Sequence, residues 1–543
     1  MSELSDTQND DLLAAPLRAI LPYWVLALVV FFAYSNIYDN VFLFDDDLLI
    51  KLNSFIHGWG HIGDILTGST TGGAHIVGGF YRPLQILLYA LAFNIGGGGT
   101  FWFHALNLAL HIANTCLVYR LGIRLRFNPI GAFLAALIWG LHPLHTEAVT
   151  YMSATADPLF AFFCLWAVVV LLPDISSRKI WMVLPLFLLG IGSKETTVMF
   201  PLLVMACLFY INPARLNFRI YLRTWPLWAV SLIYTFWRTH TAGFDGPQTY
   251  AHFYGMPEFA SLKMYADQPL YRLYTFFATL PNYLELLVRP MGLHMERSFP
   301  VFTSLWSVPS LTGLAIVVFA AAHIIYSCRS HRGMAMSFGL LWFAAAHAPD
   351  TGLLVPMNAL FLEHWMYLPS VGLFLGVAQT LVQLTQDRSR FWAVACVVVA
   401  LGFALQLSVM TYDQNKIWRD PSVFYNNIFV YGENSARARN NLALYYSDHG
   451  QYDESVEQFN EAIKSSDSYA ETRYNLALTY LRISNQQENV SKAIENLQRS
   501  IEIEPGFYRS YQTLGDIYGL LLHDQEKADS YHAQAETIIT QRN

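Results

Sequence analysis

Residues 18–34 read RAILPYWVLALVVFFAY, an apolar run with a single charge at its start. A bilayer core needs about 20 apolar residues for each helix that crosses it, so this run predicts a membrane span. The polar residues before it lack the basic region and cleavage site of a secretory signal, which favours a retained span. Similar apolar runs recur as far as Tyr412 and then stop. The chain is therefore predicted to be all-α, with a multi-pass membrane domain followed by a tail of different character.

Charge is unevenly distributed along the chain. Charged residues make up only 13% of the 543 residues, about half the ~25% that is typical of soluble domains. From Asp413 onward there are 19 acidic and 12 basic residues, so the tail carries the net charge of −7 of the whole chain. This acidic balance disfavours a nucleic-acid partner. The five cysteines lie in or beside apolar runs and indicate neither a disulfide framework nor a thiol metal site.

Basic residues predict the topology, because Lys and Arg mark cytoplasmic loops. Five short loops carry them: Arg120/Arg124/Arg126, Arg178/Lys179, Arg215/Arg219/Arg223, Arg329/Arg332 and Arg388/Arg390. Placing all five inside predicts about eleven crossings, at residues 18–38, 101–122, 129–144, 158–173, 179–192, 196–212, 220–239, 305–328, 334–350, 359–382 and 390–412. The N-terminal segment 1–17 then lies inside, and the long loops 39–100 and 240–304 lie outside with the tail. Two more apolar stretches, Pro83–Ile95 and Leu270–Val288, are expected to be interfacial or re-entrant helices.

The predicted outer face gathers the polar motifs of the membrane domain. Three consecutive carboxylates, Asp45–Asp47, follow the first span, and anionic side chains beside hydrocarbon are costly enough to suggest a functional site. The same face receives His142, His145, Glu147, Asp157, Ser193-Lys194-Glu195, His347, Asp350, Glu363 and His364. Each of these alone has a structural explanation in interhelical hydrogen bonding. Their gathering at one face favours a site.

Two polar sets have competing interpretations. His142, His145 and Glu147 follow the spacing i, i+3, i+5, which does not share one helical face well, and Pro143 disturbs the helix. We expect these side chains to hydrogen-bond around a substrate, with a divalent metal as the alternative. A second set, His104, Asn107, His111 and Asn114, lies on one face of a helix. Helix–helix packing is favoured for it over ligand binding.

The tail is predicted to be an array of tetratricopeptide repeats. Leu442-Ala443-x-x-Tyr446, Leu476-Ala477-x-x-Tyr480 and Leu514-Gly515-x-x-Tyr518 open three helix pairs, about the minimum for a stable stack. The repeats occupy residues 435–543 after a linker at 413–434. Such solenoids bind extended peptides or partner proteins, and a spacer or packing support is the alternative role.

Several short motifs occur together in this order: Phe44-Asp45-Asp46, Tyr81-Arg82-Pro83-Leu84, Phe103-His104-x-x-Asn107-x-x-x-His111, His142–Val149, Ser193-Lys194-Glu195 and Tyr367-Leu368-Pro369-Ser370. With these motifs and its repeats the chain resembles the transmembrane-and-tetratricopeptide O-mannosyltransferases (TMTC proteins), membrane glycosyltransferases of the GT-C fold. The resemblance implies a glycosyltransferase domain at residues 18–412. It implies transfer of a sugar, mannose, from a polyprenyl-phosphate donor to Ser/Thr hydroxyls of acceptor proteins that the repeats recruit.

The resemblance also assigns roles to residues. Asp45 and Asp46 are expected to be catalytic, with Asp45 as the base and Asp46 orienting it or the acceptor, in a single inverting displacement. Asp47 is an additional, solvated acid. The donor phosphate and the substrate are expected to contact Arg82, Lys194, His142, His145, Glu147, Glu363 and His364, with Arg238 and Arg297 as further candidates. No cofactor is expected. Related sequences usually carry Arg where this chain has Thr155 and His364, so the phosphate contacts must rest on the other cations.

Three alternatives follow from the same residues. The acceptor is a lipid or glycan in the first, and the chain is an inactive membrane-anchored repeat scaffold in the second, which the missing arginines favour. A transporter, the third, requires polar residues through the midplane of the membrane, whereas most here lie near one face. The compact loops and short array favour a bacterial inner membrane with periplasmic repeats over an endoplasmic reticulum with luminal repeats.

Overall fold

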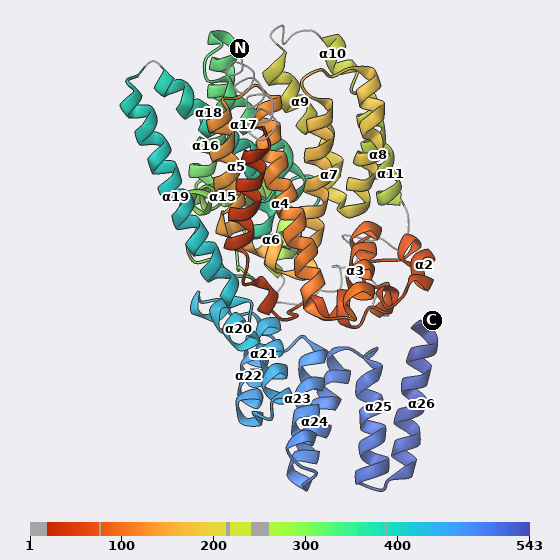
Figure 1. Ribbon diagram of the computed structural model, residues 1–543. Helices are drawn as coiled ribbons and strands as arrows, with labels where there is room; N and C mark the ends of the chain where they lie inside the picture. The colour runs from red at the N-terminus through yellow and green to blue at the C-terminus, as the bar shows by residue number, and fades with distance from the viewer. Residues whose placement is uncertain are drawn as a thin grey trace, which may run out of the picture. The chain divides into compact units, whose positions relative to one another are not determined.

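The computed structural model describes residues 19–74, 78–212, 218–240, 260–357, 359–386 and 388–542. The regular elements in these ranges are helical, which confirms the all-α fold class. The chain divides into two compact units (Figure 1). The first reaches to Arg419, and the second comprises Glu296–Ser298 and Asp420–Asn543. The predicted inner segment 1–17, the basic residue Arg215 and residues 241–259 of the long outer loop lie outside the described residues.

Among the described residues of the first unit, five helices are long and apolar enough to cross a membrane. They are Ala19–Asp39, α4 (Thr100–Arg124), Met152–Leu171 (η7 with α7), α16 (Val308–Ser330) and α19 (Arg390–Ile417). Three shorter apolar helices accompany them: α3 (Pro83–Gly96), α5 (Pro129–Gly140) and Glu195–Ile211, which comprises η8 and α9. The first unit thus has the helices of a membrane protein, and the number of eleven crossings stays a prediction.

Helices also occupy the remaining predicted spans: α8 (Ser177–Ser193), α11 (Trp225–His240), α17 (Met334–His347) and α18 (Pro369–Gln386). Two of the boundaries that differ from expectation lie near prolines. The helix expected from residue 359 begins only at Pro369, because Glu363–Met366 forms a separate 3₁₀ turn, η11. The helix expected to reach residue 144 ends at Gly140, and Pro143 opens another 3₁₀ turn. Proline favours the first turn of a helix and disfavours its interior, so each boundary falls at a proline.

Glycines allow α17 and α18 to pack closely. A Cβ atom added at Gly339 would lie 2.6 Å from the carbonyl oxygen of Gly372, and one added at Gly376 would lie 2.8 Å from that of Ala335. Small residues let membrane helices approach at backbone distance, where dispersion forces hold them together. Figure 1 shows the two helices beside each other in the first unit.

The polar stripe of α4 packs against neighbouring segments, as predicted. Asn107 donates to the Val149 carbonyl at 3.2 Å, and Asn114 donates to that of Pro158 at 2.8 Å. His111 contacts the Tyr367 hydroxyl at 2.8 Å and the Gly140 carbonyl at 2.9 Å. These bonds satisfy backbone groups that helix breaks leave open, so the stripe fixes the loops at the ends of α5 and α6 (Thr146–Thr150).

Further helices lie between the predicted spans of the first unit. They include η2 (Asp47–Lys51), α2 (Ile62–Thr67), α10 (Phe218–Leu222), α14 (Ala260–Asp267), α15 (Pro269–Val288) and η10 (Ala348–Thr351). Along α15, Arg272 donates to the Leu354 carbonyl at 3.4 Å, and the Tyr283 hydroxyl donates to that of Leu362 at 3.1 Å. Both apolar stretches expected outside the spans therefore form helices, and their interfacial position stays a prediction.

The second unit contains the three predicted helix pairs. They are α21 (Ala436–Asp448) with α22 (Tyr452–Ser465), α23 (Ala470–Ile483) with α24 (Gln487–Ile503), and α25 (Tyr508–Asp516), extended by η12 (Ile517–Leu521), with α26 (Gln525–Arg542). Ala443, Phe459 and Leu476 form a buried core between the first two pairs. The repeat array is confirmed. It is preceded by α20 (Pro421–Val430), which lies within the stretch expected as a linker.

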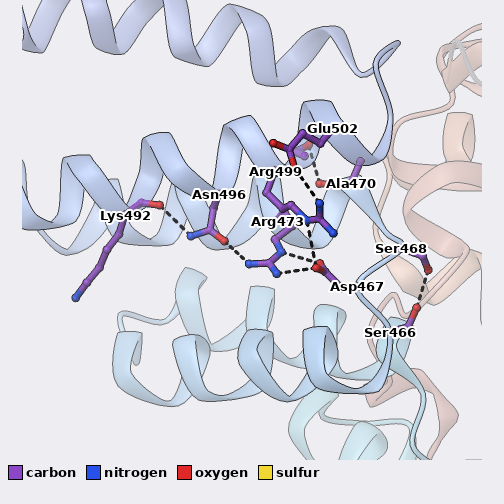
Figure 2. A network of polar contacts seen from close by, with 10 residues as sticks. Ser466, Asp467, Ser468, Ala470, Arg473, Lys492, Asn496, Arg499 and Glu502 are labelled. Atoms are coloured by element: carbon purple, nitrogen blue, oxygen red, sulfur yellow. Dashed lines mark hydrogen bonds and ion pairs between the residues drawn. The ribbon is translucent and has the colours of Figure 1, made fainter.

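An ionic network joins the second pair of helices. Asp467, before α23, accepts hydrogen bonds from Arg473 at 2.7 and 2.8 Å and from Arg499 of α24 at 3.3 Å (Figure 2). Arg473 also donates to Asn496 of α24 at 3.0 Å. One carboxylate thereby ties the start of α23 to the middle and end of α24.

Candidate active site

The three consecutive carboxylates lie in different surroundings. Phe44, directly before them, has a φ of 51°, a left-handed conformation that residues other than glycine rarely adopt. Asp45 is half-buried, and its backbone N–H donates to the Tyr151 hydroxyl at 2.9 Å. Asp47 is exposed and pairs with Lys51 at 2.7 Å. Strained backbone conformations tend to occur at functional sites, so the conformation of Phe44 supports a functional role for the adjacent Asp45.

Asp46 is buried, and its carboxylate is hydrogen-bonded to protein donors. Its carboxylate accepts hydrogen bonds from the Leu43 N–H at 2.9 Å, from the Ser153 N–H at 2.8 Å and from the Ser153 hydroxyl at 2.5 Å. Burial raises the pKa of Asp46 to about 7, and these three donors act in the opposite direction. The side chain therefore locks the turn after the first span onto residues 152–155.

The same short segment is held from the other side by α3. Gln85 donates to the Ser153 carbonyl at 2.9 Å, and the Tyr89 hydroxyl donates to that of Met152 at 2.7 Å. Arg82 lies directly before α3, as the residue at its N-cap position. Asp46 and Arg82 are far apart in sequence, yet both are positioned by residues 152–153.

Two predicted phosphate ligands are paired with carboxylates. Arg82 makes a bidentate contact with Glu195, at 2.9 and 2.6 Å, and its guanidinium lies 4.5 Å from the centre of the Phe80 ring. Lys194 bonds Asp157 at 2.7 Å, and both of these side chains are only 6% exposed. Because Lys194 and Glu195 are adjacent, the two ion pairs form a continuous row of charge.

His364 also has a carboxylate partner, Glu147. The Glu147 carboxylate accepts the His364 backbone N–H at 3.1 Å and contacts its Nδ1 at 2.8 Å. Burial lowers the pKa of His364, but the Glu147 and Asp157 carboxylates together outweigh burial and raise it above the usual value. The two carboxylates therefore stabilise the protonated imidazole of His364. Glu363, beside it, accepts the His294 N–H at 3.0 Å.

Asp350 is a further buried carboxylate of this region. Its charge interacts with those of Lys194, Asp157, His364 and Glu195, so the structure brings all five residues together. The sequence placed Asp350 on the same face without assigning it a role. Its burial, at 8% exposed, is a tertiary property that no local pattern reveals.

The side chains of His142 and His145 form hydrogen bonds with other residues of the protein. His142 contacts the Leu287 carbonyl at 3.1 Å through Nε2 and accepts the Leu144 N–H at 3.3 Å through Nδ1. His145 contacts the Trp139 carbonyl at 2.9 Å and the Ser370 hydroxyl at 3.2 Å. Their ring nitrogens thus point to protein partners, while Glu147 points to His364. Within the described ranges no three His, Cys, Asp or Glu side chains are grouped to hold a metal ion.

The two further arginine candidates lie elsewhere. Arg238 donates to the Gly79 carbonyl, close in sequence to Arg82. Arg297 belongs to the second unit, with the repeats. Arg238 therefore supports the loop that precedes α3.

Comparison with known proteins identifies relatives of both units. A family profile described as TPR repeat matches residues 443–484. The chain is 22% identical over 396 residues to Protein O-mannosyl-transferase F38B6.6 of Caenorhabditis elegans, covering 72% of the chain and 54% of that protein. It is 23% identical over 509 residues to human Protein O-mannosyl-transferase TMTC4, covering 82% and 66%, and 24% identical over 448 residues to human TMTC1, covering 73% and 49%. The chain is a relative of the TMTC proteins.

The resemblance to the TMTC proteins that the motifs predicted is thereby confirmed. The chain spans about half to two thirds of the length of these TMTC relatives. No solved structure matches it.

One departure from the TMTC pattern has a structural explanation. Thr155, where an arginine is expected, is buried, and its hydroxyl lies 2.6 Å from the Asn107 Oδ1 atom and 2.7 Å from the Met152 carbonyl. It therefore closes the turn that carries Ser153, and Arg82, Lys194 and His364 remain the candidate ligands for a phosphate.

Proposed function

We propose that the chain is a glycosyltransferase that moves mannose from a polyprenyl-phosphate donor to Ser or Thr hydroxyls of acceptor proteins. The observation that carries the proposal is the half-buried Asp45 beside a fixed Asp46, in the same unit as three buried or partly buried cations. The names of the relatives, protein O-mannosyl-transferases, support the choice of mannose and of a protein acceptor.

The proposed reaction is a single displacement. The acceptor hydroxyl attacks the anomeric carbon, its proton passes to the Asp45 carboxylate, and the bond from the anomeric carbon to the phosphate oxygen breaks. The products are an inverted glycoside and the polyprenyl phosphate. A hydroxyl is a poor nucleophile until a positioned base takes its proton, and Asp45 has this task. Asp46 holds the turn in place through Leu43 and Ser153.

Positive charge stabilises the departing phosphate. Arg82 offers a planar, bidentate guanidinium, and Lys194 offers a point charge. Protonated His364 supplies the third cation. Each has a carboxylate partner, so phosphate binding exchanges one anion for another and leaves no cation uncompensated.

The other parts of the chain fit this function. The apolar helices support a reaction at a membrane, where a polyprenyl carrier resides. In this proposal the first unit has a GT-C-like arrangement, with the site on the non-cytoplasmic face. The repeats recruit the acceptor protein. We place the chain in a bacterial inner membrane, with its repeats in the periplasm.

The test compares Asp45→Asn with Asp47→Asn in the purified full chain. With a labelled polyprenyl-phosphate mannose and a Ser/Thr peptide, transfer by Asp45→Asn should fall by roughly three orders of magnitude, as loss of a general base predicts. The Asp47 side chain is exposed and pairs with Lys51, so Asp47→Asn should retain transfer.

Each other outcome contradicts part of the proposal. Equal transfer by wild type and Asp45→Asn removes the base role of Asp45. Labelled lipid or glycan without labelled peptide replaces the acceptor class. No transfer by the wild type, with this donor and with a panel of other polyprenyl-linked sugars, favours a membrane-anchored scaffold.

A further inference from the structure

A second cationic cluster lies where α8, α10 and α11 meet, away from the residues of the candidate active site. A depression of about 250 Å³ is lined there by Ser177, Trp181, Arg219, Arg223, Trp225 and Pro226. At about 30 Å³ per water it has room for about eight waters, enough for a phosphate group and its immediate neighbours. The start of α8 and the start of α11 form its walls.

The two arginines of the depression differ from those of the active site. Arg82 is held by Glu195, whereas the guanidinium groups of Arg219 and Arg223 make no hydrogen bond or ion pair with any residue that the structure describes. Arg178 and Lys179 follow Ser177 in the first turn of α8 and add positive charge. Asp174, which is exposed, is the acidic residue nearest in sequence. Two guanidinium groups that have no anionic partner among the described residues suit an anion with several oxygens.

The aromatic walls indicate the source of that anion. Trp181 and Trp225 are 56% and 60% exposed, and their rings lie 6.1 Å apart in an edge-to-face arrangement. Leu222, which also lines the depression, is 53% exposed. Exposed tryptophans beside basic residues are typical of the membrane–water interface, where the indole lies among lipid headgroups. A free inorganic anion gains nothing from this apolar rim, whereas a lipid contacts the rim with its glycerol and upper acyl chain.

We propose that this depression, which we call the α8–α11 site, binds the phosphate of an anionic phospholipid headgroup. Arg219 and Arg223 bind the phosphate oxygens, Ser177 offers a hydroxyl, and Trp181 and Trp225 contact the lipid body. Two of the five basic loops that predict the cytoplasmic side converge here, so the lipid belongs to the cytoplasmic leaflet, opposite the proposed sugar transfer. The inference does not depend on the proposed enzymatic function.

The test measures lipid binding to the full chain in detergent by native mass spectrometry. Phosphatidylglycerol, the anionic probe, should bind about tenfold more tightly than zwitterionic phosphatidylcholine. Arg219→Gln/Arg223→Gln should lose this preference, and Arg219→Lys/Arg223→Lys should keep part of it because it retains charge without the planar fork. The matched control is Arg329→Gln/Arg332→Gln, which removes two exposed arginines of another basic loop and should leave the preference unchanged.

Competition with inorganic phosphate separates the two sources of the ligand. Partial displacement of phosphatidylglycerol by millimolar phosphate is expected, because both present the same oxygens. Saturable binding of phosphate without binding of phosphatidylglycerol overturns the lipid assignment. Equal losses in the α8–α11 and control variants, or equal binding of the two lipids by the wild type, overturn the site itself.

Discussion

At the residue scale, one backbone turn gives neighbouring carboxylates different properties. Phe44 adopts a left-handed conformation, and the chain then delivers Asp46 to the donors of Ser153 while Asp45 stays half-buried. A non-glycine residue in this conformation costs on the order of 1–3 kcal/mol, so the surrounding contacts must hold it. The hydrogen bonds to Asp46 are such contacts. Asp46 is therefore a positioning residue for Asp45 in the proposed reaction.

The pKa of Asp46 makes the stability of the protein depend on pH. Its folded-state pKa of about 7 lies above the ordinary value of 3.8, so between these values the folded protein keeps a proton that the unfolded chain has released. This contribution to stability is complete at pH 4, declines as pH rises and is lost above pH 7. Asp46→Asn cannot titrate. The melting temperature of the wild type minus that of Asp46→Asn should therefore fall from pH 4.5 to pH 7 and then level off.

Ser153→Ala provides the companion measurement. It removes the hydroxyl that donates to Asp46, so the pKa of Asp46 should rise further. The pH at which the melting-temperature difference levels off should then also rise. A flat difference between wild type and Asp46→Asn across the whole range would contradict the burial argument.

At the element scale, the contact between α17 and α18 depends on the absence of side chains. Gly339, Gly372 and Gly376 bring the two backbones together, and α18 carries at its start the residues Pro369 and Ser370 that pack near His145. A change in the spacing of α17 and α18 would therefore displace Ser370 and, through it, His145 in the segment between α5 and α6.

Gly376→Ala should destabilise the first unit. The new Cβ atom would lie 2.8 Å from the Ala335 carbonyl oxygen, a backbone atom that cannot move aside alone. Overpacking of this kind costs about 1–3 kcal/mol. Gly402→Ala in α19 is the matched control, because nothing lies within 4 Å of its Cβ position and alanine favours helix more than glycine. Thermal melting in detergent should show a loss for Gly376→Ala and none for Gly402→Ala; equal behaviour would contradict close packing.

The sequence predicted where the helices lie better than it predicted which residues contact one another. Apolar runs located the helices, and the small-and-large spacing located the repeats, because both depend on local periodicity. The polar stripe of α4 was also predictable, since its four residues share one helical face. By contrast, Lys194 and Asp157 are distant in sequence, and periodicity carries no information about which charges meet. The burial of Asp46 against Ser153 was missed for the same reason.

At the scale of the whole molecule, the division of charge follows the division into units. The tail carries the entire net charge of −7, and the rest of the chain is neutral. Within the first unit the active-site cations are matched by Glu195, Asp157 and Glu147, as burial requires. In the proposed function the acidic repeats have a different task, which is to recognise the acceptor protein in water.

Asp467→Ala should impair the function of the repeats and leave the function of the first unit intact. It removes the carboxylate shared by Arg473 and Arg499, and loss of such charged hydrogen bonds costs roughly 1–3 kcal/mol, reduced here by solvent because the side chains are partly exposed. We expect transfer to a folded acceptor protein to fall and transfer to a short free peptide to persist.

Lys464→Ala is the control for this prediction. It removes an exposed ion pair with Glu461 within one helix and should change neither reaction. Parallel losses with the protein and the peptide acceptor in Asp467→Ala would show that the repeats do not select the acceptor.

The paired cations of the active site have a consequence for selectivity. Glu195, Asp157 and Glu147 act as built-in counterions, so Arg82, Lys194 and His364 remain compensated between catalytic cycles. An incoming anion must compete with a carboxylate already in contact. Weak or singly charged anions lose this competition, whereas a lipid phosphate arrives with its tail already held by the membrane. If the proposed function holds, the three carboxylates favour ligands delivered from the bilayer over anions that arrive from solution.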